Sequence, residues 1–77
     1  MDTGNLVKMA NEIGSFFAAW PDRDAARTEV ANHLKKFWDP RMRKAIVAHV
    51  QVSGADSGLE PLAAEAVGVL AGERKAG

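Results

Sequence analysis

The residue types of this 77-residue sequence limit its chemistry, because it contains no cysteine and only two histidines, His33 and His49. Without cysteine there can be no thiolate zinc site, iron–sulfur ligation or thiol nucleophile. Each histidine lies on or beside the apolar stripe of a different predicted helix, without a carboxylate at metal-ligand spacing. We interpret both as packing residues with one ring nitrogen hydrogen-bonded. No glycine-rich phosphate loop is present either. The sequence therefore predicts a non-catalytic chain that carries no metal or cofactor of its own.

One segment stands out, residues 32–44, which reads Asn-His-Leu-Lys-Lys-Phe-Trp-Asp-Pro-Arg-Met-Arg-Lys and combines two aromatic residues with five cationic ones. Residues 33–44 carry a net charge of +4, residues 1–32 and 53–77 carry −2 each, and the whole chain is neutral. The positive charge is therefore local, whereas a free-standing nucleic-acid-binding domain is more often basic overall. The segment predicts a binding surface.

Four amphipathic helices must position this segment, because apolar residues recur every three or four positions between breaks at proline, glycine and aspartate. The first two are predicted over residues 3–19 and 23–38, with Asp22 as the N-cap of the second. Asp39 caps the third, which Pro40 opens. A turn over residues 53–58 precedes a fourth helix beginning at Pro61.

We therefore expect an all-α fold, a small bundle of three to four short amphipathic helices in one domain covering residues 1–77. Sequential helices are expected to be antiparallel neighbours, and the ends, about residues 1–3 and 72–77, to fray. Gly14 inside the first helix indicates either a close helix crossing or chance, and the sequence does not distinguish them.

Helical geometry divides the aromatic residues between core and surface. The stripe of the first helix (Leu6, Met9, Ile13, Phe16, Phe17 and Trp20) is expected to pack inward. In the second helix Leu34 and Phe37 lie in the stripe, while Trp38 lies roughly 80° from it. A tryptophan at the edge of a stripe is typical of an interface anchor.

The cations divide in the same way. Lys35 and Lys36 close the second helix, where positive charge suits the helix dipole, whereas Arg41, Arg43 and Lys44 crowd the start of the third, where it does not. An external anion or acidic surface would offset that cost. The predicted partner-binding residues are Trp38, Arg41, Met42, Arg43, His33 and Lys44.

Two blocks of the sequence resemble a known family, the delta subunit of NAD-dependent, molybdenum-containing formate dehydrogenases. Residues 6–17, LVKMANEIGSFF, resemble its opening LVKMANQIGxFF, and residues 32–43 resemble its NHLRKFWDPRMR signature. Residues 59–67 are similar to a third block, so that the resemblance covers about residues 5–70. Glu12 stands where the family has glutamine, and Glu60 where a serine or threonine cap is usual.

The resemblance implies a non-catalytic accessory subunit of a cytoplasmic alpha-beta-gamma-delta complex that oxidises formate or reduces carbon dioxide. The catalytic alpha subunit would carry the molybdenum bis-guanine-dinucleotide cofactor and iron–sulfur clusters, beta would bind FMN and NAD, and gamma would hold a further cluster. The delta subunit would bind alpha and support its assembly, stability or cofactor insertion.

Two alternatives remain beside this interpretation. The first is a small helical nucleic-acid-binding module that uses the basic residues 35–44; zero net charge and the lack of Asn or Gln early in the third helix argue against it. The second is a homo-oligomeric helical adaptor.

No apolar run approaches the ~20 residues of a membrane span, and no signal peptide is recognisable, so we expect a soluble, cytoplasmic protein.

Overall fold

The computed structural model describes residues 2–76, and the side-chain surroundings of residues 2–73. The elements are α1 (Thr3–Phe17), α2 (Arg23–Phe37), α3 (Pro40–Ser53), the short 3-10 helix η1 (Gly54–Asp56) and α4 (Pro61–Ala76). The described chain contains no strand, and the predicted all-α fold is confirmed. The tail expected to fray from Gly72 is helical as far as Ala76; Met1 and Gly77 lie outside the described residues.

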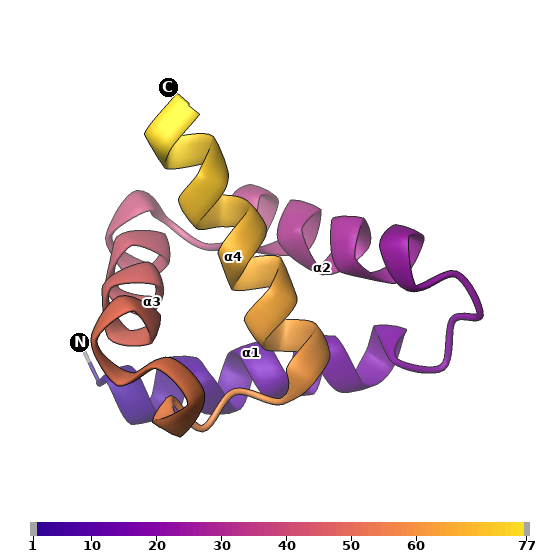
Figure 1. Cartoon of the computed structure of the whole chain (residues 1–77), viewed down its shortest axis with the longest axis horizontal. Coiled ribbons are helices and arrows are strands. Elements are labelled where there is room, and N and C mark those ends of the chain that lie inside the picture. The colour runs from indigo at the N-terminus through magenta and orange to yellow at the C-terminus, as the bar shows by residue number, and fades with distance from the viewer. Residues whose placement is uncertain (1, 77) are drawn as a thin grey trace.

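Helices α1 and α2 run antiparallel beside each other, α3 stands across one end of the pair, and α4 crosses over both (Figure 1). The prediction of antiparallel sequential neighbours is thus correct for α1 and α2 and wrong for α2 and α3, because α3 lies across the end of α2 and packs mainly against α4 and α1. Helix α4 packs against all three other helices. One face of the α1–α2 pair is therefore covered by α4, and no helix among the described residues covers the opposite face.

The helix boundaries follow from capping groups that the sequence identifies. Asp22 accepts a hydrogen bond from the backbone N–H of Ala25 at 3.1 Å, and Asp39 accepts one from Met42 at 3.0 Å. Both side chains satisfy N–H groups that have no partner within their helix. Helix α2 ends one residue earlier than predicted, because Trp38 before Asp39 has an extended backbone with φ −88° and ψ 139°.

Two buried clusters make up the core. The larger lies among all four helices and contains Leu6, Ala10, Leu34, Trp38, Ile46, Val47, Ala63, Val67 and Leu70. The smaller lies between α2 and α4 and contains Ala26, Val30, Ala31, Leu62 and Ala66. At Gly14 an added Cβ would lie 3.4 Å from the Ala63 Cβ. Of the two explanations for Gly14, the structure supports the close helix crossing.

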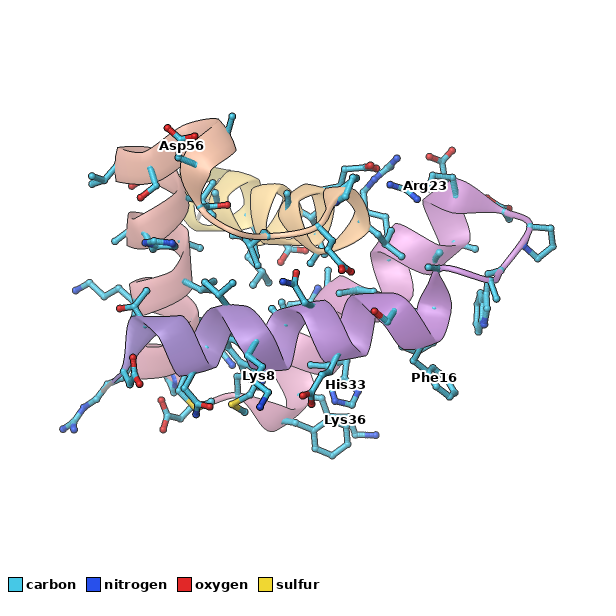
Figure 2. All side chains as sticks on the ribbon, turned by 90° about the horizontal axis from the view of Figure 1, so that it is seen from below. Lys8, Phe16, Arg23, His33, Lys36 and Asp56 are labelled. Carbon is cyan, nitrogen blue, oxygen red and sulfur yellow. The ribbon has the colours of Figure 1, made fainter. Side chains whose placement is uncertain are left out.

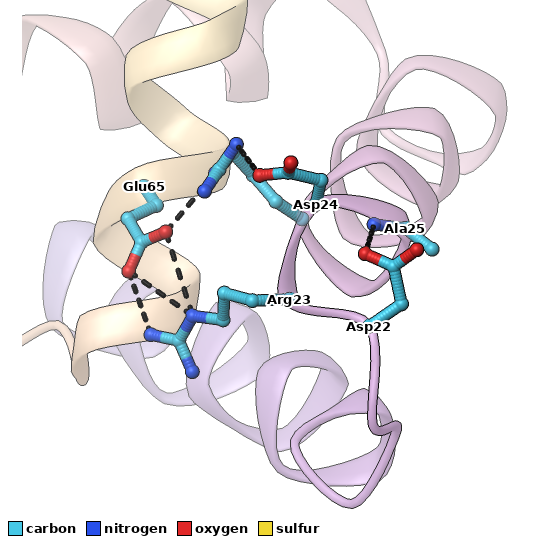
Figure 3. A network of polar contacts seen from close by, with 6 residues as sticks. Asp22, Arg23, Asp24, Ala25 and Glu65 are labelled. Carbon is cyan, nitrogen blue, oxygen red and sulfur yellow. Dashed lines mark hydrogen bonds and ion pairs between the residues drawn. The ribbon is translucent and has the colours of Figure 1, made fainter.

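Polar contacts fix α4 across the α1–α2 pair. The side-chain amide of Asn11 donates to the Gly58 carbonyl at 3.0 Å, and its oxygen accepts from the Glu60 N–H at 2.8 Å. Further along α4, Glu65 accepts from both Arg23 and Arg27 of α2, at 2.6 and 3.0 Å (Figure 3). The hydrogen bond from Arg23, followed by that from Arg27, lowers the pKa of Glu65 below its usual range.

Candidate interaction surface

The structure places Trp38 in the core rather than at the surface. Its side chain is 4% exposed and belongs to the cluster that includes Leu6, Leu34 and Ile46. The prediction that Trp38 faces outward is therefore wrong. It assumed that α2 continues through position 38; the extended backbone at Trp38 instead turns its side chain toward the core.

Arg43, a second residue predicted to face outward, is half-buried and used within the chain. Its Nη1 donates to the carbonyl of Trp38 at 2.6 Å and to that of Lys35 at 2.9 Å. These carbonyls lie at the carboxyl end of α2, where helix geometry leaves acceptors without partners and a positive charge is favoured. Arg43 therefore joins the end of α2 to the first turn of α3, a role that its sequence position did not reveal.

The remaining residues of the segment 32–44 differ in whether their side chains are exposed to a partner. Met42 is half-buried and packs against the larger core cluster, whereas Arg41 and Lys44 are exposed on α3. Lys35 forms an ion pair with Glu73 at 3.0 Å. Contact of Arg41, Met42 or Lys44 with a partner stays a prediction. The pairing of Lys35 and the internal bonds of Arg43 weaken the nucleic-acid alternative, because they reduce the charge free to contact phosphates.

The structure instead exposes aromatic residues on the face of α1 and α2 that α4 leaves open and in the connection between these two helices. Phe16 is 74% exposed, Phe37 65% and Trp20 42%. Phe17 and His33 between them are half-buried, and we call these five residues the aromatic surface. In Figure 2 Phe16, His33 and Lys36 lie on the side of the α1–α2 pair away from α4. The predictions that Phe16, Trp20 and Phe37 pack in the core are wrong. For Phe16 and Phe37 the apolar stripe is wider than the face that neighbouring helices cover, whereas Trp20 lies beyond the end of α1 at Phe17 and so is not on that stripe.

Ring contacts hold the aromatic surface together. Phe17 makes edge contacts with both Phe16 and Trp20, with ring centroids 4.9 and 5.1 Å apart. On α2 the His33 and Phe37 rings lie 4.6 Å apart, and the Lys36 ammonium lies 5.6 Å from the Phe37 centroid. Such contacts stabilise the exposed rings by about 0.5–1.5 kcal/mol per pair beyond area burial. The surface is therefore partly ordered before any partner binds.

Two adjoining open hollows lie along this surface, and His33 and Phe17 line both of them. The first is lined by Glu12, Ile13, Phe16, Phe17 and His33. The second is lined by Phe17, Glu29, Asn32, His33, Lys36 and Phe37. Each hollow is therefore lined by aromatic side chains together with one carboxylate.

The two histidines have different surroundings. The His49 Nε2 donates to the Ser57 carbonyl at 2.8 Å, and Ser53 Oγ lies 3.5 Å from its Nδ1, so the predicted packing role with one bonded nitrogen is confirmed for His49. The His33 ring lies against the Phe37 ring at a tilt of 45°, and within the described residues it has no hydrogen-bond partner, so the prediction of one bonded nitrogen is wrong for His33. In the same part of the chain, no three His, Cys, Asp or Glu side chains gather as a metal site would need. Nor is any helix described here sufficiently long and apolar to cross a bilayer.

The fold and the exposed surface define a class, a small all-α chain with aromatic side chains exposed on one face. The model of one protein family, "NADH-dependant formate dehydrogenase delta subunit FdsD", matches residues 5–67. Because this match covers most of the chain, the protein belongs to the FdsD family, and the resemblance seen in the sequence is confirmed. No curated protein and no solved structure matches the chain.

Proposed function

We propose that this chain is a non-catalytic delta subunit that binds the catalytic alpha subunit of formate dehydrogenase and supports its assembly, stability or cofactor insertion. Membership in the FdsD family supports this proposal, since the family is named as a subunit of that enzyme. The observation that carries the binding role is the aromatic surface, where Phe16 and Phe37 expose 74% and 65% of their area.

Exposure of several aromatic rings to water costs free energy that a chain acting alone does not recover. Contiguous apolar patches on soluble domains mark interaction sites, and aromatic residues supply much of the binding energy at protein interfaces. Among the described residues Val52 is also large, apolar and 89% exposed, but it lies alone on α3, as single surface residues often do. A partner that covers the aromatic surface would remove several rings from water at once.

Under this proposal the redox groups belong to the partner subunits. The molybdenum bis-guanine-dinucleotide cofactor and iron–sulfur clusters would reside in alpha, and FMN and NAD would bind elsewhere in the alpha-beta-gamma-delta complex, which would work in the cytoplasm. The chain would act on alpha through contact alone, which is consistent with a sequence that offers no thiolate ligand.

The test is to produce the alpha, beta and gamma subunits with and without this chain. We expect the chain to co-purify with alpha, and its omission to lower the amount of soluble alpha, its molybdenum content or its formate-oxidising activity. Equal yield, metal loading and activity in both preparations, together with no association between purified alpha and this chain, would refute the proposal.

A further inference from the structure

Two carboxylates at the aromatic surface are unused by the fold. Glu12 and Glu29 each line one hollow, and neither forms an ion pair with another described residue. Lys8 lies one turn before Glu12 on α1 and Lys36 lines the same hollow as Glu29, yet neither lysine is within ion-pair distance. By contrast, Glu65 binds two arginines.

The surroundings of these carboxylates match the chemistry that recognises a cationic side chain. An aromatic face attracts an ammonium or guanidinium group within about 6 Å of its centroid, and a neighbouring carboxylate supplies charged hydrogen-bond acceptors. The Phe37 ring already accepts a cation, since the Lys36 ammonium lies 5.6 Å from its centroid. Arginine suits such a site best, because its planar guanidinium stacks on a ring while it donates to a carboxylate.

We propose that the aromatic surface is the docking face for a partner segment that inserts an arginine or lysine, flanked by apolar side chains, into the hollows beside Glu12 and Glu29. The inserted cation stacks on Phe16 and pairs with Glu12, or stacks on Phe37 and pairs with Glu29. The apolar side chains beside it in the partner segment cover the exposed ring area. The partner is the alpha subunit, so this inference rests on the proposed function.

Charge argues against a second copy of this chain as the occupant. A two-fold dimer places the same patch on both sides of the interface. Each copy would bring Glu12 and Glu29 but only Lys36 among the hollow-lining cations, so the contact would gather more carboxylates than cations. A cationic segment of a different protein neutralises the same carboxylates without that repulsion.

The test measures binding of the purified full chain to the alpha subunit, with circular dichroism as the check that each variant is folded. Replacing exposed Phe16 and Phe37 by serine should weaken binding about thirty-fold or more, as expected for central aromatic contacts. Glu12→Lys with Glu29→Lys should weaken it at least about tenfold, and the Gln variants should weaken it less and reduce its salt dependence.

Matched controls lie on other faces of the molecule. Val52→Ser removes an apolar side chain that is 89% exposed on α3, and Asp56→Lys reverses an exposed charge far from the aromatic surface (Figure 2). Both controls should bind alpha like the unmodified chain.

The outcomes separate this inference from the proposed function. If the unmodified chain does not bind alpha, the proposed function fails. If it binds and the Phe16 and Phe37 variant binds equally well, only the docking face is wrong. If the Phe variant loses binding but the Glu12 and Glu29 reversal does not, the cationic occupant is wrong. A concentration-dependent mass of the isolated chain that Phe16→Ser abolishes would identify a second copy as the occupant and overturn the inference.

Discussion

The adjacent aromatics Phe37 and Trp38 provide the sharpest test of the structure, because they have opposite environments. Trp38 is 4% exposed within the larger core cluster, whereas Phe37 is 65% exposed on the aromatic surface. We predict that Trp38→Ala destabilises the fold severely and that Phe37→Ala does so only slightly. Helical periodicity predicts the reverse.

The magnitudes follow from burial. Truncating a buried tryptophan to alanine costs about 3–5 kcal/mol of unfolding free energy, through lost transfer energy and the cavity left behind. A domain of this size has a total stability of roughly 4–12 kcal/mol. Full burial of phenylalanine contributes about 1.5–3 kcal/mol, so the buried third of Phe37 contributes about 0.5–1 kcal/mol.

Urea unfolding followed by far-UV circular dichroism measures both effects, and Trp38→Phe supplies a milder variant should Trp38→Ala fail to fold. Trp38→Ala should lower the melting temperature by at least about 12 °C, given that 1 kcal/mol corresponds to roughly 4–8 °C in a domain of this size. In Trp20→Phe, the fluorescence of Trp38 should be that of a buried indole and should shift to longer wavelength on unfolding. A loss below about 1 kcal/mol for Trp38→Ala, or equal losses for the two alanine variants, would refute the assignment of Trp38 to the core.

Three further predictions test the contacts that fix the helices. Gly14→Leu should destabilise the fold by about 1–3 kcal/mol in chemical denaturation through overpacking against Ala63, while Gly14→Ala should be neutral or stabilise it by up to about 1 kcal/mol. Arg43→Met should lower the free energy of unfolding by about 1–2 kcal/mol, and Arg41→Met should lower it by less than about 0.5 kcal/mol. Similar losses for the two variants would contradict the role of Arg43 at the end of α2. The pKa of Glu65 is lowered in the folded state by its hydrogen bonds from Arg23 and Arg27. These ion pairs therefore stabilise the fold at pH values above the usual pKa range of a glutamate, and the stabilisation is lost as the pH falls through the lowered pKa. Glu65→Gln should therefore show a shallower loss of stability in that acidic range, and identical acid-unfolding curves would contradict the arginine pairing.

The local features of the chain could be predicted from the sequence because they depend on neighbouring residues. Asp22 and Asp39 cap helices, and Pro40 opens α3, through contacts within three residues along the chain. The aliphatic residues Leu6, Leu34 and Ile46 lie in the stripes and in the core. The family resemblance, which depends on residue identity alone, was also visible in residues 6–17 and 32–43.

The candidate site could be predicted only in part. His33 was singled out, and it lines both hollows of the aromatic surface. Periodicity places Phe16, Trp20 and Phe37 in the core instead, because it shows which residues share a helix face but not how much of that face a neighbour covers, nor that α1 ends at Phe17 before Trp20. The signal that could have indicated them is the width of the stripes, which exceeds what one neighbouring helix covers.

The sequence by itself determined the helices, their caps and the family, since these depend on residue types and short spacings. Only the tertiary structure decided which aromatic residues are buried, because that depends on the backbone direction at one residue and on the path of α4. The extended backbone at Trp38 turns its indole into the core, and α4 covers one face of the α1–α2 pair. Phe16 and Phe37 remain on the open face, beside the carboxylates of Glu12 and Glu29.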